Sequence, residues 1–533
     1  MDTHTSLPLL RFLLLFVLNQ IMTTTIANYT SICTLTPYPN LCNSLTTISQ
    51  QTLVKNVVDL HAASLRVTLA RVQEARSHIA TKIKRSLLNK LERTAWIDCS
   101  ELYEDTIHHL NRSIGATSTI DFHDAQTWLS AAIANQETCE NGFRDFNLSV
   151  DHFRSSPFVG LTKFLSNSLA ISKARVADNS DEIIGTNQRR KRRNHRRRYD
   201  FRDWAVAQSS DAPMKADIVV ARDGTGDYMS ISEALKSISK GRKGEGMERI
   251  VIYVKKGVYM ENVEVKRSMK NIMMIGDGID RTVVVASKSV QDGFTTFRSA
   301  TVGVSGDGFV AIGMTFRNAA GAEKHQAVAL RSSSDHSIFY KCSFEGYQDT
   351  LYVHSQRQFY RDCDIYGTVD FIFGDAASIF QNCNIYIRKP LPHQTNTVTA
   401  QGRKSPNENT GIVIQNSVIT AASDLIPVQR LYSSYLGRPW KKYSRTVLIK
   451  CRIDGVVDPA GWSPWSGDFG LSTLYYAEYM NVGIGARTEA RVNWPGFHVI
   501  GRAGEAGMFA VGNFYSGDQS WIAAAGVPFT AGV

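Results

Sequence analysis

The sequence lacks any apolar run long enough to cross a bilayer. Its N-terminal apolar stretch, Phe12–Leu18, follows Arg11 and precedes small residues up to Ala27. A bilayer span needs about 20 apolar residues, so a retained membrane anchor is disfavoured. A charged start, a short apolar core and small residues predict instead a signal peptide over residues 1–27, cleaved after Ala27. The chain is therefore predicted to be secreted, with no membrane partner after signal removal.

Two signatures common among hydrolases are also missing. No Gly-x-Ser-x-Gly motif occurs, so the strained turn that presents a nucleophilic serine is not expected. No cluster of His or Cys has the spacing of metal ligands. The sequence therefore predicts no serine nucleophile, no metal site and no cofactor.

Acidic residues are outnumbered: 49 Asp and Glu stand against 60 Lys and Arg, a formal net charge of +11. Much of this excess lies in the run Arg189–Arg198, which repels itself and is typical of an extended linker. In a cytosolic protein such a run would indicate nucleic-acid binding, but the signal peptide argues against a nucleic-acid partner. In a secreted chain the run is predicted to be cut by a processing protease.

The eight cysteines fall into two even groups, as expected of disulfides in a secreted chain. The front group is Cys33, Cys42, Cys99 and Cys139, and the back group is Cys342, Cys363, Cys383 and Cys451. Three glycosylation sequons begin at Asn28, Asn111 and Asn147, all in the front half. Glycans are therefore expected only on that half.

Between about Gln50 and Lys173, apolar residues recur at helical spacing. The stripes are Val58, Leu65, Leu69, Val72 and Ile79; Ile107, Leu110 and Ile114; Leu129, Ile133 and Gln136; and Leu161, Phe164, Leu165 and Leu169. Four amphipathic segments with short polar connections predict an all-α, up-and-down four-helix bundle.

From Ala216 onward the pattern changes to short strands separated by Gly and Asn. Cys342, Cys363 and Cys383 lie in versions of one strand pattern and recur at 21 and 20 residues. A repeat of this length predicts an all-β solenoid of stacked coils. The segment Ser232–Ile238 is predicted to be a helix that covers the first coil.

Two aspartates share the period of this repeat. Asp349 and Asp370 are 21 residues apart, and Gln326 and Gln348 are 22 apart. Because parallel strands lie about 4.8 Å apart, residues one coil apart become neighbours. Two close carboxylates cannot both ionise cheaply, so one tends to stay protonated, which provides an acid beside a base or nucleophile. Spacing alone leaves open that these residues occupy turns or polar ladders.

Five ordered motifs in this region resemble the pectin methylesterases, or pectinesterases, of plants. They are Gly257–Glu261, Gln326–Arg331, Gly346–Leu351, Gly367–Gly374 and Leu436–Trp440. The resemblance implies a right-handed parallel β-helix. It also implies hydrolysis of the methyl esters of homogalacturonan (pectin) in the cell wall.

The resemblance further implies a role for each matched residue. Asp370 would be the nucleophile, Asp349 the proton donor and later base, and Arg438 the partner of Asp370. Gln326 and Gln348 would stabilise the oxyanion. The implied substrate-binding set is Thr296, Gln326, Arg438, Trp440, Tyr352 and Phe373. The alternative for Trp440, Tyr352 and Phe373 is that their rings pack against one another in the β-helix and do not bind sugar.

The front half resembles the invertase and pectin methylesterase inhibitor family. This resemblance implies disulfides Cys33–Cys42 and Cys99–Cys139, while the pectinesterase resemblance implies Cys363–Cys383. The expected organisation is a signal peptide (1–27), an inhibitor-like bundle (28–175), a basic linker (176–203) and a β-helix (204–533). The bundle is expected to inhibit or escort the enzyme, and separate inhibitor proteins are further expected partners.

Three other functions are alternatives to ester hydrolysis. A pectate lyase would need a calcium-binding carboxylate cluster, and a polygalacturonase several acids around a glycosidic oxygen. A wall-binding protein without activity would not need the intact set of Asp349, Asp370 and Arg438 with both glutamines.

Overall fold

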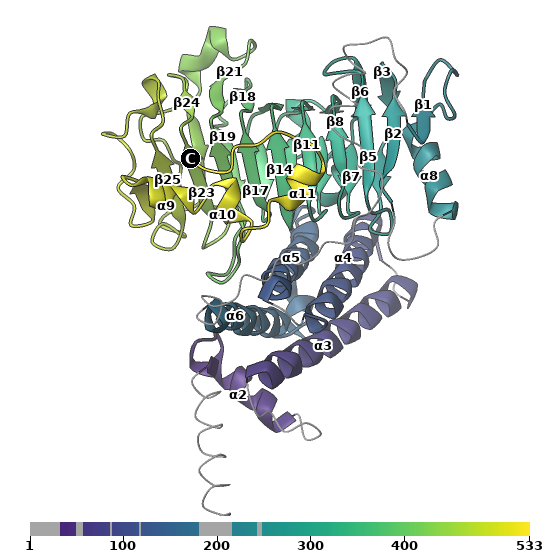
Figure 1. Cartoon of the computed structure of the whole chain (residues 1–533), viewed down its shortest axis with the longest axis vertical. Coiled ribbons are helices and arrows are strands. Elements are labelled where there is room, and N and C mark those ends of the chain that lie inside the picture. The colour runs from purple at the N-terminus through teal and green to yellow at the C-terminus, as the bar shows by residue number, and fades with distance from the viewer. Residues whose placement is uncertain (1–31, 49–56, 86–87, 117–118, 181–215, 242–247) are drawn as a thin grey trace, which may run out of the picture. The chain divides into compact units, whose positions relative to one another are not determined.

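The structure is a computed structural model that describes residues 32–48, 57–85, 88–116, 119–180, 216–241 and 248–533 (Figure 1). The predicted signal peptide, Asn28 and the basic run Arg189–Arg198 lie outside these ranges. Contacts divide the chain into two compact units. The first comprises Met1–Ser86, Cys99–Gln136 and Val150–Arg189; the second comprises Leu87–Asp98, Glu137–Ser149 and Arg190–Val533.

The front half of the chain is helical, as predicted. Its helices are α2 (Pro39–Ile48), α3 (Val57–Arg85), α4 (Lys90–Ile114), α5 (Thr119–Arg144), the short η1 (Asp151–Arg154) and α6 (Leu161–Ser180). Helix α4 begins with reciprocal hydrogen bonds between Asn89 and Glu92, a capping box that satisfies two free backbone N–H groups. The four long helices α3 to α6 confirm the expected helical segments. Helix α6 continues to Ser180, beyond the predicted bundle boundary.

Within the first unit, α3 and α6 are joined by buried hydroxyl groups. Ser168 lies 2.6 Å from the Ser64 hydroxyl and 3.0 Å from that of Thr68. The predicted stripe on α3 is largely buried, since Leu65, Val72 and Ile79 are fully inaccessible. The prediction that Val58 belongs to the buried stripe is wrong, because Val58 lies in the first turn of α3 and is 51% exposed.

The front cysteines are oxidised. Cys33 and Cys42 form a disulfide with Cα atoms 5.4 Å apart, which confirms that predicted pair. Cys99 and Cys139 are disulfide-bonded as well. Among the helices of the described residues, none has the length and apolar content that a bilayer span requires.

The second unit contains a parallel β-helix made of three sheets, in which every paired strand runs parallel to its neighbour (Figure 1). The first sheet joins, in order, β1 (Ile218–Val220), β2 (Ile250–Val254), β5 (Ile272–Gly276), β8 (Val310–Ile312), β11 (Ser337–Tyr340), β14 (Arg357–Arg361), β17 (Ala377–Gln381), β20 (Gly411–Gln415), β23 (Arg445–Ile449), β25 (Tyr475–Tyr479) and β26 (Phe497–Val499).

The other two sheets complete each coil. One joins β22 (Ser434–Gly437), β19 (Asn396–Gln401), β16 (Ile372–Gly374), β13 (Leu351–Val353), β10 (Leu330–Ser332), β7 (Val302–Val304) and β4 (Val263–Val265). The last joins β24 (Arg452–Ile453), β21 (Val418–Ala421), β18 (Asn384–Ile387), β15 (Asp364–Gly367), β12 (Ser343–Glu345), β9 (Thr315–Asn318), β6 (Thr282–Ala286) and β3 (Gly257–Met260). This architecture confirms the predicted β-helix.

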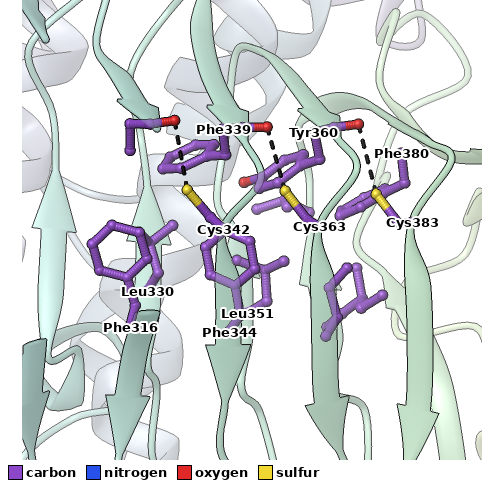
Figure 2. Close-up of a cluster of buried hydrophobic side chains, with 14 of the residues drawn as sticks. Phe316, Leu330, Phe339, Cys342, Phe344, Leu351, Tyr360, Cys363, Phe380 and Cys383 are labelled. Carbon is purple, nitrogen blue, oxygen red and sulfur yellow. Dashed lines mark hydrogen bonds between the residues drawn. The ribbon is translucent and has the colours of Figure 1, made fainter. Parts of the chain in front are cut away.

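The repeat seen in the sequence corresponds to a turn between two sheets. Each repeat cysteine follows a residue with positive φ: 51° at Lys341, 51° at Asp362 and 58° at Asn382. Directly before these turns, Phe339, Tyr360 and Phe380 stack in the interior with ring centroids 4.8 and 4.4 Å apart (Figure 2). One side chain per coil thus occupies the same interior position, which is why the pattern recurs.

The predicted Cys363–Cys383 disulfide is wrong for this structure, because both residues are free and buried, as are Cys342 and Cys451. Each thiol is turned toward the preceding coil instead of bridging. Cys363 Sγ lies 3.4 Å from the carbonyl oxygen of Phe339, and Cys383 Sγ lies 3.8 Å from that of Tyr360 (Figure 2). The expectation of free interior thiols at Cys342 and Cys451 therefore holds for all four cysteines, and Ser417 occupies the equivalent position on the coil between Cys383 and Cys451.

Helices and the C-terminus cover exposed parts of the β-helix. Helix α8 (Ile231–Gly241) places Ile231 and Leu235 in the interior cluster, which confirms the predicted capping helix. At the other end of the chain, α9 (Ala503–Gly507), α10 (Val511–Phe514) and α11 (Ser520–Ala524) contribute to an apolar cluster on the outer face of the first sheet (Figure 1). Gln381 and Gln415 of this sheet donate hydrogen bonds to the carbonyls of Thr530 and Gly532.

Short 3₁₀ turns lie in the connections between strands. They are η3 (Phe297–Ser299), η4 (Ala322–Lys324), η5 (Ile426–Leu431) and η6 (Ile484–Ala486).

Candidate active site

One pocket of the second unit contains the predicted site residues. It has a volume of about 510 Å³ and lies beside the sheet that contains β10, β13, β16, β19 and β22. The predicted residues that line it are Gln326, Gln348, Asp349, Asp370, Arg438, Thr296, Tyr352, Phe373 and Trp440. Four of the five motifs are thus brought together, and Gly257–Glu261 contributes no lining residue.

The β-strand register places the two aspartates on neighbouring coils. Leu351 of β13 pairs with Ile372 of β16, so Asp349 and Asp370 occupy equivalent positions two residues earlier. Both have left-handed backbones, with φ of 61° and 52°, a conformation that Asp tolerates better than most residues. The turn before each strand therefore directs both carboxyl groups toward the pocket that they line.

Asp370 is held by two partners. Its Oδ1 accepts hydrogen bonds from Arg438 Nε at 2.8 Å and Thr397 Oγ1 at 2.7 Å, while its Oδ2 accepts one from Arg438 Nη2 at 2.6 Å. The Asp370 side chain is only 7% exposed. A two-pronged guanidinium contact and a hydroxyl donor fix the orientation of this carboxylate.

Asp349 has the opposite electrostatic environment. Burial raises the pKa of Asp349 well above its ordinary value, and the negative charges of Asp370 and Asp145 raise it further against the effect of Arg438. The neutral, protonated form of Asp349 is thereby favoured beside a charged Asp370. The pair provides one proton donor and one carboxylate in the same pocket.

The aromatic site residues pack against one another. Tyr352 and Phe373 stack in register on β13 and β16 with centroids 4.2 Å apart, and Trp440 meets Phe373 edge-on at 6.0 Å. Tyr352 and Phe373 are almost fully buried. They form the ladder that was the alternative to sugar stacking, and at the same time they line the pocket.

The segment 137–149, which belongs to the second unit, also lines this pocket. Its contributing residues are Thr138, Asn141, Gly142, Arg144, Asp145 and Asn147. Asp145 Oδ2 accepts a hydrogen bond from the Thr296 backbone N–H at 2.7 Å. Thr138 Oγ1 lies 3.1 Å from the Tyr352 hydroxyl. The sequon residue Asn147 is exposed at the same pocket, whereas Asn111 is exposed on α4.

Asp98 makes a similar contact near Thr296. Its Oδ1 accepts hydrogen bonds from Arg298 Nε at 2.9 Å and Nη2 at 2.7 Å, and its other oxygen accepts one from Thr295. The segments Leu87–Asp98 and Glu137–Ser149 thus both place a carboxylate on the residues around Thr296.

Sequence reasoning did not find several of these residues. Thr397 follows Asp370 by 27 residues, so it falls outside the repeat of about 21 that revealed the aspartates. Trp465, with its ring centroid 4.4 Å from the Arg438 guanidinium carbon, has no repeat partner either. In segment 137–149 the sequence showed only Cys139 and the sequon at Asn147, and neither carries information about a site in a different part of the chain.

Comparison with known proteins agrees with this geometry. The pectinesterase family profile matches residues 217–518, and the profile described as plant invertase/pectin methylesterase inhibitor matches residues 27–171. The chain belongs to the pectinesterase family. As a pectinesterase it is a carboxylic ester hydrolase, and it also carries a segment of the inhibitor family.

Relatives and solved structures extend the match. An Arabidopsis thaliana protein named "Probable pectinesterase/pectinesterase inhibitor 6" is 49% identical over 95% of this chain and 94% of its own length. "Pectinesterase 2" of Citrus sinensis is 48% identical over 94% of each chain. The solved structure of a pectin methylesterase from carrot is 54% identical, with a TM-score of 0.59, and covers 61% of this pectinesterase and 100% of its own chain.

Proposed function

We propose that this pectinesterase hydrolyses the methyl esters of polygalacturonate (pectin) in the plant cell wall, with Asp370 as nucleophile and Asp349 as acid and base. The observation that carries this proposal is the contrast between the two carboxyl groups. Asp370 accepts hydrogen bonds from Arg438 and Thr397, while burial and neighbouring charges favour protonated Asp349.

The first half of the reaction forms an acyl-enzyme. Asp370 attacks the ester carbonyl carbon, and the carboxamides of Gln326 and Gln348 donate hydrogen bonds to the resulting oxyanion. The bond to the methoxy oxygen then breaks, and Asp349 gives its proton to that oxygen, so that methanol leaves. Asp370 is left in a mixed anhydride with the galacturonyl group, and Asp349 is ionised.

The second half restores both aspartates. Asp349 takes a proton from water while the water oxygen attacks the anhydride carbonyl, and the bond to Asp370 breaks. The galacturonic acid formed releases its proton to solvent. Thr296, Arg438, Trp440, Tyr352 and Phe373 bound the space in which the sugar must lie during both steps.

The decisive experiment is methanol release from methyl-esterified pectin. The full-length chain is expected to release methanol, and chelators are expected to leave the rate unchanged. A lyase would release no methanol and would instead cleave the chain by elimination, with a rate that EDTA removes and calcium restores.

The contacts of segment 137–149 support a further part of the proposal, an inhibitory role. This segment lines the pocket and places Asp145 on Thr296, so it would compete with a polygalacturonate chain for the same space. Secretion followed by cleavage in Arg189–Arg198 would turn an internal contact into one between separable chains, which dilution weakens.

The inhibitory role is tested by comparing cut and uncut protein. A variant in which the Lys and Arg of Arg189–Arg198 are replaced by Gln should stay uncut and release methanol more slowly than the cut protein. Equal specific activity of the two forms would leave the front half with a role in folding or targeting only.

A further inference from the structure

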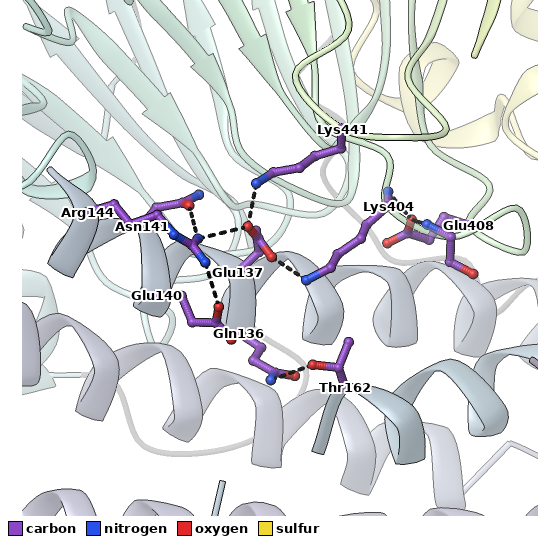
Figure 3. A network of polar contacts seen from close by, with 10 residues as sticks. Gln136, Glu137, Glu140, Asn141, Arg144, Thr162, Lys404, Glu408 and Lys441 are labelled. Atoms are coloured by element: carbon purple, nitrogen blue, oxygen red, sulfur yellow. Dashed lines mark hydrogen bonds and ion pairs between the residues drawn. The ribbon is translucent and has the colours of Figure 1, made fainter. Parts of the chain in front are cut away.

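Two lysines beside the pocket form a binding site for a carboxylate. The Glu137 carboxylate lies between Lys404 and Lys441, with one oxygen accepting from each ammonium group (Figure 3). Glu137 is 8% exposed, and the Lys441 side chain is 17% exposed. The arrangement is therefore a desolvated contact, in which charge pairing is stronger than at an open surface.

Both lysines are supplied by the β-helix at neighbouring coils. Strands β19 and β22 pair with Thr399 opposite Gly437, and Lys404 and Lys441 follow five and four residues later. The Lys404 loop is fixed because Glu408 Oε2 accepts hydrogen bonds from the backbone N–H groups of Lys404 at 2.8 Å and Ser405 at 2.6 Å. The lysine positions thus depend on the coil stack.

The site adjoins the reacting residues. Lys441 Nζ lies 5.0 Å from the ring centroid of Trp440, which lines the pocket together with Asp370. A Cβ atom on Gly402 would come within 3.0 Å of the Trp440 ring, so this glycine allows the ring to lie close against the Lys404 loop. Trp440 therefore contacts Lys441 and also lines the pocket that contains both aspartates.

The electrostatics require an anion at this position. Burial alone would raise the pKa of Glu137, but Lys441 and Lys404 outweigh that effect and hold it at about 2. Burial lowers the pKa of Lys441, and the nearby charges of Lys404 and Arg144 act in the same direction, against Glu137. Without a carboxylate between them, the two ammonium groups would repel each other in a poorly solvated place.

We propose that Lys404 and Lys441 bind the free carboxylate of an unesterified galacturonate residue next to the reacting methyl ester, and that Glu137 occupies this site in place of that carboxylate. The proposal rests on the proposed function, since it takes the ligand to be a galacturonate chain. It assigns recognition of a free carboxylate beside the reacting ester to these two lysines.

The test measures binding of a fully de-esterified galacturonate oligomer to the full-length chain by calorimetry at low salt. Glu137→Gln should bind the oligomer about tenfold or more tightly than the wild type, because the lysines are no longer neutralised. Adding Lys441→Gln to this variant should remove the gain. The matched control adds Lys442→Gln, an exposed neighbour with no carboxylate partner among the described residues, and should keep the gain.

A second ligand tests the charge specificity. A fully methyl-esterified oligomer of equal length should bind Glu137→Gln with and without Lys441→Gln within about twofold, because it has no free carboxylate inside the chain. If Glu137→Gln does not fold, Glu137→Asp replaces it, since the shorter side chain cannot reach both lysines equally.

Two outcomes would overturn the site. These are equal binding of the acidic oligomer to wild type and Glu137→Gln, or a gain that persists when Lys441 is replaced. Neither depends on turnover, so failure of the site and failure of the proposed function are distinguishable. Methanol release without the binding gain removes only the site, and a Lys441-dependent gain without methanol release removes only the esterase mechanism.

Discussion

The two units of the chain bring distant residues together in different ways. In the β-helix, residues about 21 positions apart become neighbours on adjacent coils, as Leu351 and Ile372 do. In the helical unit, buried partners such as Ser64 and Ser168 are 104 residues apart. In a stacked fold, the period of the sequence therefore predicts which residues are neighbours. In a helical unit, the sequence predicts only which face of each helix is buried.

The cysteines follow the same division. Those of the front half are in disulfides, while the four of the β-helix are free, buried thiols. A coil stack buries a large interior without cross-links, but a short helical segment such as α2 has little core of its own. Disulfides therefore occur in the part of the chain where buried packing provides less stability.

The largest expected effect tests whether the chemistry belongs to the stacked coils. Asp370→Asn should reduce methanol release about a thousandfold or more, because the amide keeps the shape but is not a nucleophile. Asp362→Asn is the matched control, with the same change at a left-handed residue of the same coil that lies outside the pocket. Its rate should stay within about twofold of wild type. Turnover by Asp370→Asn within tenfold of wild type would remove Asp370 from its role.

The next effect concerns stability and compares the two units directly. Leu351→Ala in the coil interior and Leu65→Ala in α3 each remove a fully buried side chain and should each cost about 3 kcal/mol of unfolding free energy. Denaturant unfolding followed by far-UV circular dichroism should show two transitions, one for each unit. Leu351→Ala should lower the midpoint of one transition and Leu65→Ala that of the other. Leu431→Ala, at a residue 76% exposed, is the control and should cost under about 0.5 kcal/mol. If both core variants shift one common transition equally, the units do not unfold separately.

The third effect distinguishes two carboxylates of segment 137–149 by pH. Burial raises the pKa of Asp145 from 3.8 to about 6, with Asp98 adding to it, so its contribution to stability is present below about pH 4 and is lost as pH rises through 6. Glu137, held at about 2, behaves oppositely: its contribution is present above pH 4.5 and is lost as pH falls toward 2. Each shift corresponds to at most about 3 kcal/mol, since one pKa unit is about 1.4 kcal/mol.

The measurement is the free energy of unfolding at several pH values. Asp145→Asn should flatten the decline between pH 4 and 6, and Glu137→Gln should flatten the rise between pH 2 and 4.5. A decline of the same slope in wild type and Asp145→Asn would show that another group titrates there.

The smallest effect is a change in the number of reactive thiols. Denatured but unreduced protein should have four, because the back cysteines are free. Cys383→Ala should have three. A bridge between Cys363 and Cys383 would instead give two thiols in the wild type and three in Cys383→Ala. A fall in the thiol number on substitution therefore indicates free cysteines, and a rise indicates a disulfide.

The sequence allowed the fold and the centre of the site to be predicted because both depend on the repeat. Asp349 and Asp370 were found by their spacing, and α8 by its helical pattern before the first coils. Thr397 was not found, since the connection from β16 to β19 is longer than the repeat. The Cys363–Cys383 bridge was wrong because spacing places the two residues on adjacent coils but does not determine the direction of their side chains.

The contacts of segment 137–149 could not be predicted for a different reason. Glu137 and Asp145 lie at the end of α5 and just after it, and their sequence positions indicate only a helix terminus. Their partners Lys404, Lys441 and Thr296 follow more than 150 residues later, with no shared periodicity. Such contacts depend on how two surfaces far apart in the sequence fit each other, and no periodic pattern in a single sequence predicts that fit.

The covering of the first sheet by the C-terminus has a consequence for synthesis of the chain. The outer face of this sheet is apolar from Val251 on β2 to Ala477 on β25, and Phe509, Phe514 and Ile522 complete its cluster. A ribosome makes the chain from the N-terminus, so the coils emerge long before the residues that cover them. During that interval the growing solenoid exposes an apolar face, and we expect chaperones to bind nascent chains until about the last 30 residues are released.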